Sequence, residues 1–160
     1  MTGGTDMTAI FDLLWECAMA LVGTVAFALL FSVPRRYYLW CGLIGGAGLA
    51  AFKLIDPFWG RTAAIFCAAA LVIFLSRLRA VKERCPVTIF MVAGLFPLVP
   101  GAGIYWAIYE LVMDNPAAAS GRGTEALTDA VAIVLGIIIV FELPQKWFRR
   151  LAGQKPPPKG

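Results

Sequence analysis

The chain has 160 residues, of which 60% are hydrophobic and only 15% are charged, with a mean hydropathy of +0.78 and a net charge of +4. This composition excludes a soluble globular domain, in which about 25% of residues are charged. Histidine is absent, which excludes histidine metal sites and histidine proton relays. The four cysteines are too widely spaced for a zinc site or a disulfide framework, so we expect them to act as small apolar residues.

Five apolar segments follow one another along the chain, each long enough to cross a membrane. They are residues 9–32, 37–55, 58–76, 86–113 and 126–148. No Lys or Arg precedes the first segment and no small-residue cleavage site follows it, so we expect it to be retained rather than removed as a signal peptide. The predicted fold is an all-α integral membrane protein in which residues 1–150 form a single domain of about five transmembrane helices.

Two acidic residues lie one turn apart on a single face of the first span. Asp12 is close to the start of the span and is expected to be interfacial, whereas Glu16 lies roughly 9–10 Å deeper at 1.5 Å per residue. A charge at the centre of a membrane helix costs about 2.5–3.5 kcal/mol on insertion scales. Glu16 is therefore a candidate for coupling or gating, and the alternative is a structural hydrogen bond to a neighbouring helix.

Small residues mark one face of the second and third spans. Gly42 and Gly46 are four residues apart in the second span, and alanines recur along the third. Such residues let helix backbones approach closely, so we interpret them as packing positions, with a ligand-lining face as the alternative. The short Asp56-Pro57 connection predicts a tight antiparallel hairpin, and Lys53 is expected to extend outward and pair with Asp56.

The fourth span is interrupted near its middle by two prolines and two glycines. Pro100 lacks an amide hydrogen and clashes with the preceding turn, while Gly101 and Gly103 lower the cost of unwinding. In hydrocarbon a broken helix persists only where protein or a water-filled cavity surrounds it, and transporters use such breaks to build binding sites near mid-depth. We therefore predict a helix broken at Pro97–Gly103. The alternative is a proline-kinked structural helix.

A half-helix that restarts after Pro100 exposes amide hydrogens and a partial positive charge, which attract carboxylates. Carbonyls released before Pro97 face the other way and suit an ammonium group or a cation. Together these groups predict a site for a small carboxylate or an amino acid. The candidate substrate-binding residues are Pro97, Pro100, Gly101, Ala102, Gly103 and Tyr105.

The remaining acidic residues of the apolar segments lie near the ends of the spans. Glu110 is about one turn from the end of the fourth span, and Asp129 has a similar depth in the fifth. Both are expected to be interfacial or vestibule groups, and Glu110 joins Glu16 as a candidate for coupling or gating. Glu142 is four residues before Lys146, which predicts an intrahelical ion pair.

The basic residues predict the orientation of the chain. If the five helices alternate, 11 of the 14 Lys and Arg residues fall on one side, and the other side receives only Lys53, Arg61 and Arg122. The positive-inside rule then places the N-terminus outside and the C-terminus in the cytoplasm. Residues 114–125 are predicted to form an outer loop, and residues 151–160 a disordered basic tail.

Two segments of the chain resemble a known family. Residues 86–101, PVTIFMVAGLFPLVPG, followed by Tyr105, are similar to the signature of the threonine/serine exporter (ThrE-type) family. Residues 31–36, FSVPRR, followed by Trp40-Cys41 and Gly45, resemble the short YjjB-type subunits of that family. The length and the span count also agree, so the resemblance covers nearly the whole chain.

The resemblance implies a subunit that exports small metabolites across the bacterial inner membrane: threonine and serine for full-length members, and dicarboxylates such as succinate for split ones. Full-length members have two membrane halves, and this chain resembles the C-terminal half. The implied partners are therefore membrane lipid, a second membrane subunit resembling the N-terminal half and a small carboxylate or amino-acid substrate, without a cofactor, a metal or nucleic acid.

Two other functions were weighed against export. The first is a membrane scaffold or assembly factor that contains no transport path. The second is an intramembrane enzyme, which is disfavoured because the chain has no histidine, no serine–base pair and no acid pair near the middle of two helices.

Overall fold

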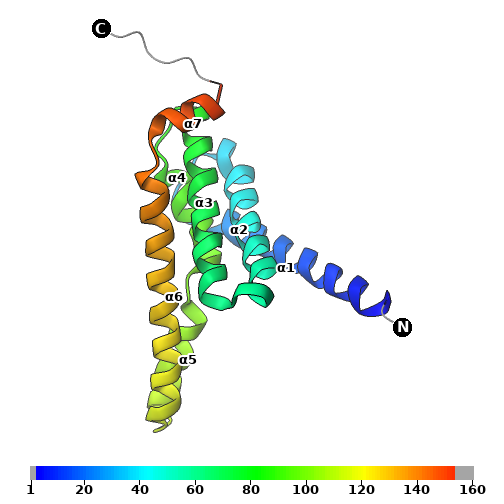
Figure 1. The fold of residues 1–160 in the computed structure, drawn as a ribbon, viewed down its shortest axis with the longest axis vertical. Coiled ribbons are helices and arrows are strands. Elements are labelled where there is room, and N and C mark those ends of the chain that lie inside the picture. The colour runs from blue at the N-terminus through cyan, green and yellow to red at the C-terminus, as the bar shows by residue number, and fades with distance from the viewer. Residues whose placement is uncertain (1–2, 154–160) are drawn as a thin grey trace.

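The computed structural model describes residues 3–153 and, from residue 11 onward, their side chains. Every regular element in this range is a helix (Figure 1). The long helices are α1 (Gly3–Leu30), α2 (Tyr38–Trp59), α3 (Arg61–Glu83) and α6 (Pro116–Glu142). The shorter elements are η1 (Arg35–Tyr37), α4 (Thr88–Leu95), η2 (Phe96–Leu98), α5 (Gly101–Val112) and α7 (Gln145–Leu151), where η denotes a 3₁₀ turn. Residues 154–160 of the predicted tail lie outside the described residues.

Four of these helices, α1, α2, α3 and α6, are individually long and apolar enough to cross a membrane. The pair α4 and α5 qualifies together as a fifth span, bent by 47°. An all-α membrane protein with four spans, or five if the bent pair counts as one, is therefore confirmed, and so is the break in the fourth. The direction in which the chain crosses the membrane stays a prediction.

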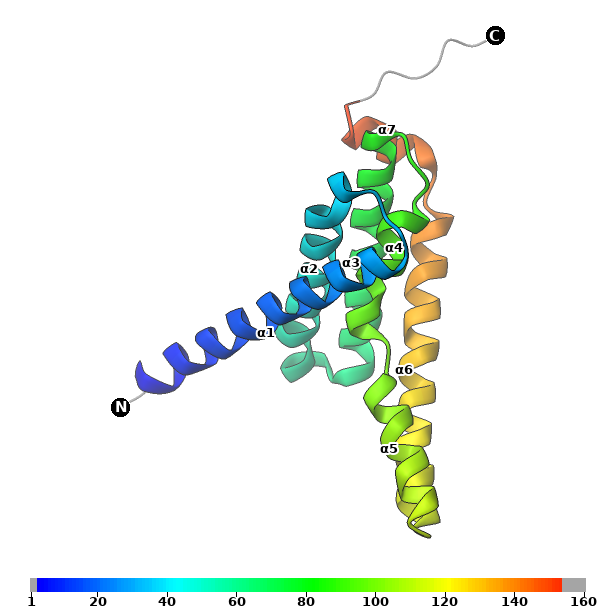
Figure 2. The same ribbon diagram turned by 180° about the vertical axis from the view of Figure 1, so that it is seen from behind.

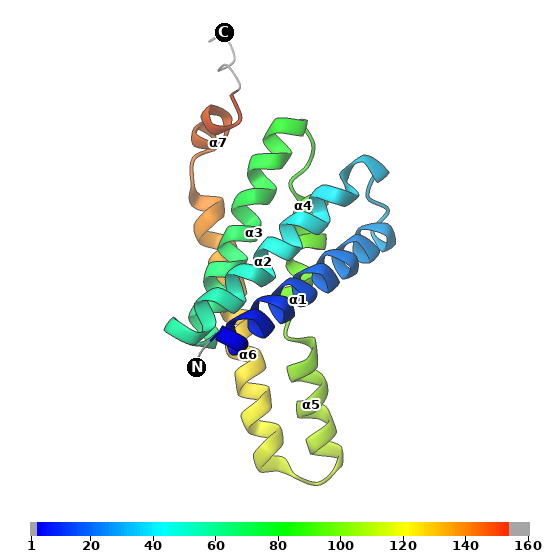
Figure 3. The same ribbon diagram turned by 90° about the vertical axis from the view of Figure 1, so that its right-hand side faces the viewer.

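Helix α3 lies at the centre of the bundle (Figures 1 and 3). It forms an antiparallel hairpin with α2, and the turn is at Gly60, whose φ of +80° glycine adopts without strain. α1 packs along α2, α6 packs along α3, and α4 packs against both α2 and α3. α7 packs on α3 at the opposite end from Gly60. We call the two ends of this bundle the Gly60 end and the Arg84 end.

The main apolar core lies between α2, α3 and α4. It includes Cys41, Val72 and Phe90, which are fully buried. All four cysteines are free thiols. Cys41 therefore contributes to the core as a small apolar side chain.

Glycines allow the long helices to approach closely. A Cβ atom at Gly45 of α2 would overlap Thr24 of α1, and one at Gly48 would overlap Val72 of α3. A Cβ atom at Gly136 of α6 would lie 2.9 Å from a backbone oxygen of α3. Since each contact needs a missing side chain, these glycines are packing positions, as predicted for the small residues of the second span.

The loop predicted at residues 114–125 is wrong, because α6 already begins at Pro116. The side-chain oxygen of Asn115 accepts a hydrogen bond from the amide of Ala118 at 3.4 Å. Proline at the first helical position needs no amide partner and has the φ of a helix. The Asn-Pro pair that suggested a loop is thus the cap and first residue of a helix.

Two predicted ion pairs are also wrong. α6 ends at Glu142, and Leu143-Pro144 separates it from α7, so Glu142 and Lys146 do not share a helix. Lys53 pairs with Glu16 of α1 rather than with Asp56. Helix α2 also continues through Pro57 to Trp59, because a proline in the last turn removes only one helical hydrogen bond.

Candidate functional site

The break between α4 and α5 consists of a 3₁₀ turn, an extended residue and a tight turn. Helix α4 continues into η2, and Val99 is extended, with φ −62° and ψ 129°. Pro100 has φ −76° and ψ 47°, close to an inverse γ-turn, and the amide of Gly101 donates to the carbonyl of Val99 at 2.7 Å. The break predicted at Pro97–Gly103 is therefore a real interruption rather than a kink in a continuous helix.

The start of α5 leaves backbone donors free. The amide of Ile104 donates to the carbonyl of Pro100 at 3.1 Å, which closes the first helical turn. Among the described residues, the amides of Ala102 and Gly103 have no partner. Ala102 is exposed and Gly103 is half-buried, so these two unpaired N–H groups lie at an accessible helix N-terminus.

The other predicted binding residues near this helix start differ in their exposure. Pro100 is buried and Pro97 is half-buried, so both shape the turn rather than present a surface. The carbonyls of Pro97 and Leu98 accept no hydrogen bond from the described chain. Tyr105 lies four residues beyond Gly101, on the same face of α5, and is 61% exposed. Its ring lies next to those of Trp106 and Tyr109.

The break lies at the Gly60 end of the bundle. A Cβ atom at Gly103 would lie 3.3 Å from that of Ala126 in α6, about one turn before Asp129, which contacts the first residue of α3. Helix α5 and the first half of α6 therefore form a hairpin that projects beyond the turn between α2 and α3 (Figures 2 and 3). The sequence placed the break near the middle of an apolar segment. In the structure the break lies instead level with the first turn of α3, at one end of the bundle.

Glu16, the first candidate for coupling or gating, forms an ion pair between α1 and α2. Its Oε2 atom lies 2.7 Å from Nζ of Lys53, and the two side chains are 43% and 41% exposed. The close approach of the two helices depends on Gly45 of α2, where a Cβ atom would overlap Thr24 of α1. The pair is thus reachable from outside the chain.

Glu110, the second candidate, lies near the tip of the hairpin formed by α5 and α6. Its Oε1 atom lies 3.8 Å from Nε of Arg122, and the Asn115 side-chain amide donates to its Oε2 atom at 3.2 Å. It is nine residues beyond Gly101, or about 13 Å along a helix. The structure therefore brings Glu110 neither to the free amides nor to Glu16, which is on a different helix pair.

Asp129 is not the interfacial or vestibule group that was predicted. Its side chain is 3% exposed, and its Oδ2 atom accepts a hydrogen bond from Nε of Arg61 at 2.9 Å. This ion pair joins the first turn of α3 to the middle of α6. Sequence reasoning missed it because the two residues are 68 positions apart, and depth along a span does not reveal which face an acid occupies.

Arg77 is a second residue whose role sequence reasoning missed. Its Nη1 atom donates to the carbonyls of Val140, Phe141 and Leu143, the last two at 3.2 and 3.1 Å. The guanidinium also lies over the ring of Phe148 in α7, 4.3 Å from its centre. The signal was Pro144, which ends a helix and leaves its last carbonyls without donors.

The two segments that resemble the exporter family meet in space. Residues 31–34, after α1, and residues 88–93 of α4 line one pocket of about 330 Å³. The hydroxyl-bearing residues Ser32 and Thr88 are both exposed there. Segments that are far apart in the sequence thus form one surface at the start of α4.

Comparison with known proteins gives the family. A family model described as "Threonine/Serine exporter, ThrE" matches residues 16–142, which include the break and the ion pairs of Glu16, Asp129 and Glu110. The chain belongs to the threonine/serine exporter family. As a member of this family with four or five candidate spans, it is a multi-pass bacterial membrane protein.

A curated relative of this chain is much longer than the chain itself. The "Probable threonine/serine exporter" of Mycobacterium tuberculosis (strain ATCC 25618 / H37Rv) is 31% identical over 110 residues, which are 66% of this chain and 20% of the relative. The chain therefore spans about a fifth of the length of the relative that it matches. No solved structure matches the chain.

Proposed function

We propose that this chain is one subunit of an exporter of small metabolites, and that it works with a second membrane subunit resembling the N-terminal half of the family. The proposed substrates are amino acids such as threonine and serine, or dicarboxylates such as succinate. The observation that carries the proposal is the helix start with unpaired amides at Ala102 and Gly103, inside the segment that matches the family.

The proposed substrate site is the N-terminus of α5. Two unpaired N–H groups and the positive end of a 12-residue helix attract a carboxylate, the group that all the proposed substrates share. The free carbonyls of Pro97 and Leu98 would take the ammonium group of an amino acid. Pro100 and Gly101 set the turn, and the ring of Tyr105 forms the exposed wall one turn further on.

The surroundings of α5 support the proposal of a second subunit. This helix has no buried residue and packs mainly on α6, which leaves its other face open (Figure 2). In a membrane, free backbone groups must be surrounded by protein or line a water-filled path. This chain supplies only one wall, so the second membrane subunit would supply the other.

We propose coupling or gating roles for Glu16 and Glu110. Each forms an ion pair with a residue of the neighbouring helix, Lys53 and Arg122, and each pair is partly exposed. Loss of either ion pair would remove one contact between neighbouring helices. This is a local event that a proton-coupled or gated exporter could use.

The test compares two glycines in an export assay. A Cβ atom at Gly101 or at Gly121 meets nothing within 4 Å, so both positions have open space where a side chain would begin. Only Gly101 adjoins the free amides. We expect Gly101→Leu to lower threonine or succinate release from loaded cells that express both subunits by more than about tenfold, and Gly121→Leu to leave it near the wild-type rate.

Equal release by the two variants, at equal membrane levels, would contradict the proposed site. The same assay tests the alternative of a scaffold or assembly factor. A scaffold predicts that Gly101→Leu weakens pull-down of the second subunit while release by the assembled protein is unchanged. Unchanged release in cells that lack this chain would contradict the export proposal as a whole.

A further inference from the structure

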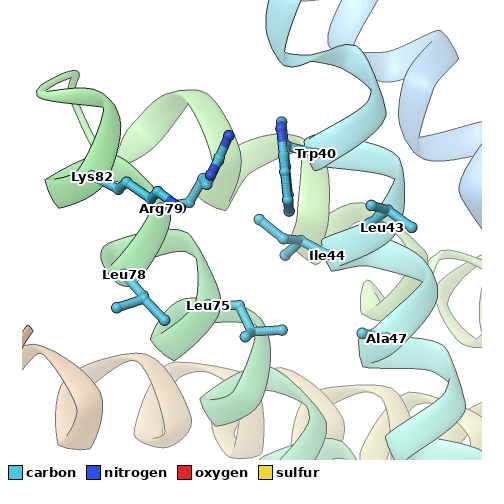
Figure 4. Close-up of a pocket in the computed structure, with 8 residues that line it drawn as sticks. All are labelled: Trp40, Leu43, Ile44, Ala47, Leu75, Leu78, Arg79 and Lys82. Atoms are coloured by element: carbon cyan, nitrogen blue, oxygen red, sulfur yellow. The ribbon is translucent and has the colours of Figure 1, made fainter. Parts of the chain in front are cut away.

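We propose that a groove between α2 and α3 at the Arg84 end binds one anionic phospholipid, with the lipid phosphate between Arg79 and Lys82 and an acyl chain along the groove. This inference does not depend on the proposed export function. It follows from the shape, the apolar walls and the charge of a pocket away from the α4–α5 break (Figure 4).

The walls of the groove are apolar and come from both helices. The pocket has a volume of about 410 Å³, within the range of ligand sites. Its lining residues are Trp40, Leu43, Ile44 and Ala47 of α2 and Leu75, Leu78, Arg79 and Lys82 of α3. Leu43 and Trp40 are 44% and 37% exposed, so the groove opens to the outside of the chain rather than into its core.

The basic residues lie at one end of this groove. The Arg79 guanidinium lies over the ring of Trp40, 3.6 Å from its centre, and its Nη2 atom is 2.7 Å from Oε1 of Glu83 (Figure 4). Its Nε atom is buried and has no hydrogen-bond partner. Lys82 is exposed and forms no ion pair with any described residue. A phosphate oxygen placed here would meet the free ammonium group of Lys82 beside the Arg79 guanidinium.

Further charge near this end favours an anion. Arg36 and Tyr37 precede α2, and Arg36 lies over the Tyr37 ring. Arg84 follows α3 and is exposed. Arg79 of α3 lies over the ring of Trp40 of α2, so the start of α2 and the end of α3 lie together. Glu83 is the nearby acid, and it is already paired with Arg79.

These features fit a lipid better than a soluble anion. Basic residues beside helices at a membrane surface bind anionic head groups, and tryptophan is enriched at that level. A soluble phosphate would use only the basic end, whereas the groove continues beside Ala47 and Leu75. An acyl chain covers this apolar surface and brings its own phosphate to the basic end.

The test measures lipid binding by the full chain. The purified, delipidated protein is titrated with phosphatidylglycerol or with phosphatidylcholine, and the dissociation constant is measured by native mass spectrometry. We expect Lys82→Gln to weaken phosphatidylglycerol binding about fivefold, because one basic group near the surface contributes about that factor. Phosphatidylcholine binding should weaken less, because its choline group offsets the phosphate charge. Excess inorganic phosphate should not displace the lipid.

Two further variants keep the test decisive. Ala47→Phe fills the groove without changing a charge, and we expect it to weaken the binding of both lipids. Arg150→Gln removes an exposed basic residue of α7 that does not line the groove, and it should change binding less than twofold. Wild-type affinity in both Lys82→Gln and Ala47→Phe would overturn the proposal. So would displacement by inorganic phosphate, or an equal loss in Arg150→Gln.

Discussion

Asp129 and Arg61 illustrate how a single ion pair is placed in this bundle. The carboxylate is buried at 3% exposure, while the guanidinium is 58% exposed and remains accessible to water. The two partners therefore differ in what they lose when the pair is broken. A buried charge without its partner is costly, whereas an exposed arginine without its partner is not.

This asymmetry gives a stability prediction. We expect Arg61→Gln to destabilise the protein by about 3 kcal/mol, because it leaves Asp129 buried and charged, and Asp129→Asn by about 1 kcal/mol. Thermal unfolding in detergent measures both, and the double variant should resemble Asp129→Asn. A larger loss for Asp129→Asn than for Arg61→Gln would contradict this account of the pair.

Arg77 links the C-terminal end of α6 to α7. Its guanidinium donates to the last carbonyls of α6 and also lies over Phe148 of α7. Lysine has the same charge but lacks the planar fork of donors.

We therefore expect Arg77→Lys to free α7 from the end of α6. Hydrogen exchange of the amides in residues 145–151 should become at least about tenfold faster, as the loss of one charge-assisted hydrogen bond implies. Arg149→Lys, a half-buried position on α7 itself, serves as the control. Unchanged exchange in Arg77→Lys would mean that packing of Phe148 alone holds α7.

At the scale of elements, local chemistry explains which predictions succeeded. Prolines and glycines act on their own backbone, so the break at Pro97–Gly103 could be predicted from the sequence. The start of α6 was missed because Asn115-Pro116 occurs both in loops and at the start of helices. The residues that follow decide between the two. Alanines after Pro116 favour the helix.

Other features could not be predicted because they depend on packing between distant elements. The level of the break relative to α3 depends on how far an irregular segment extends, which spacing does not determine. The pairing of Lys53 with Glu16 rather than with Asp56 depends on the contact between α1 and α2 that Gly45 permits. The free amides could be predicted from the prolines. The surface that faces them could not, because we propose that it belongs to a second subunit.

In the molecule as a whole, α5 packs mainly on α6 and has no buried residue. Figure 2 shows the hairpin of α5 and α6 projecting on one side and α1 extending on another. Exposed apolar side chains line α5, among them Ile104, Ile108 and Val112. Such a surface suits contact with another membrane subunit.

The proposed partner can be located by crosslinking. A photo-crosslinking residue at Ile108, which is 57% exposed, should capture the second membrane subunit when both are expressed. The same residue at Ile73, which is fully buried in α3, should not capture it. Capture from both positions, or from neither, would contradict an interface on α5.

We propose that the start of α5 binds the carboxylate of the substrate. The backbone amide resonances of this chain report such binding at the atoms concerned. The assembled two-subunit protein, labelled with ¹⁵N in this chain, is titrated with threonine or succinate. Our account predicts saturable shifts of the Ala102 and Gly103 amide signals, which are the unpaired donors of the helix start. Saturable shifts elsewhere in the chain, with these two signals unchanged, would contradict it.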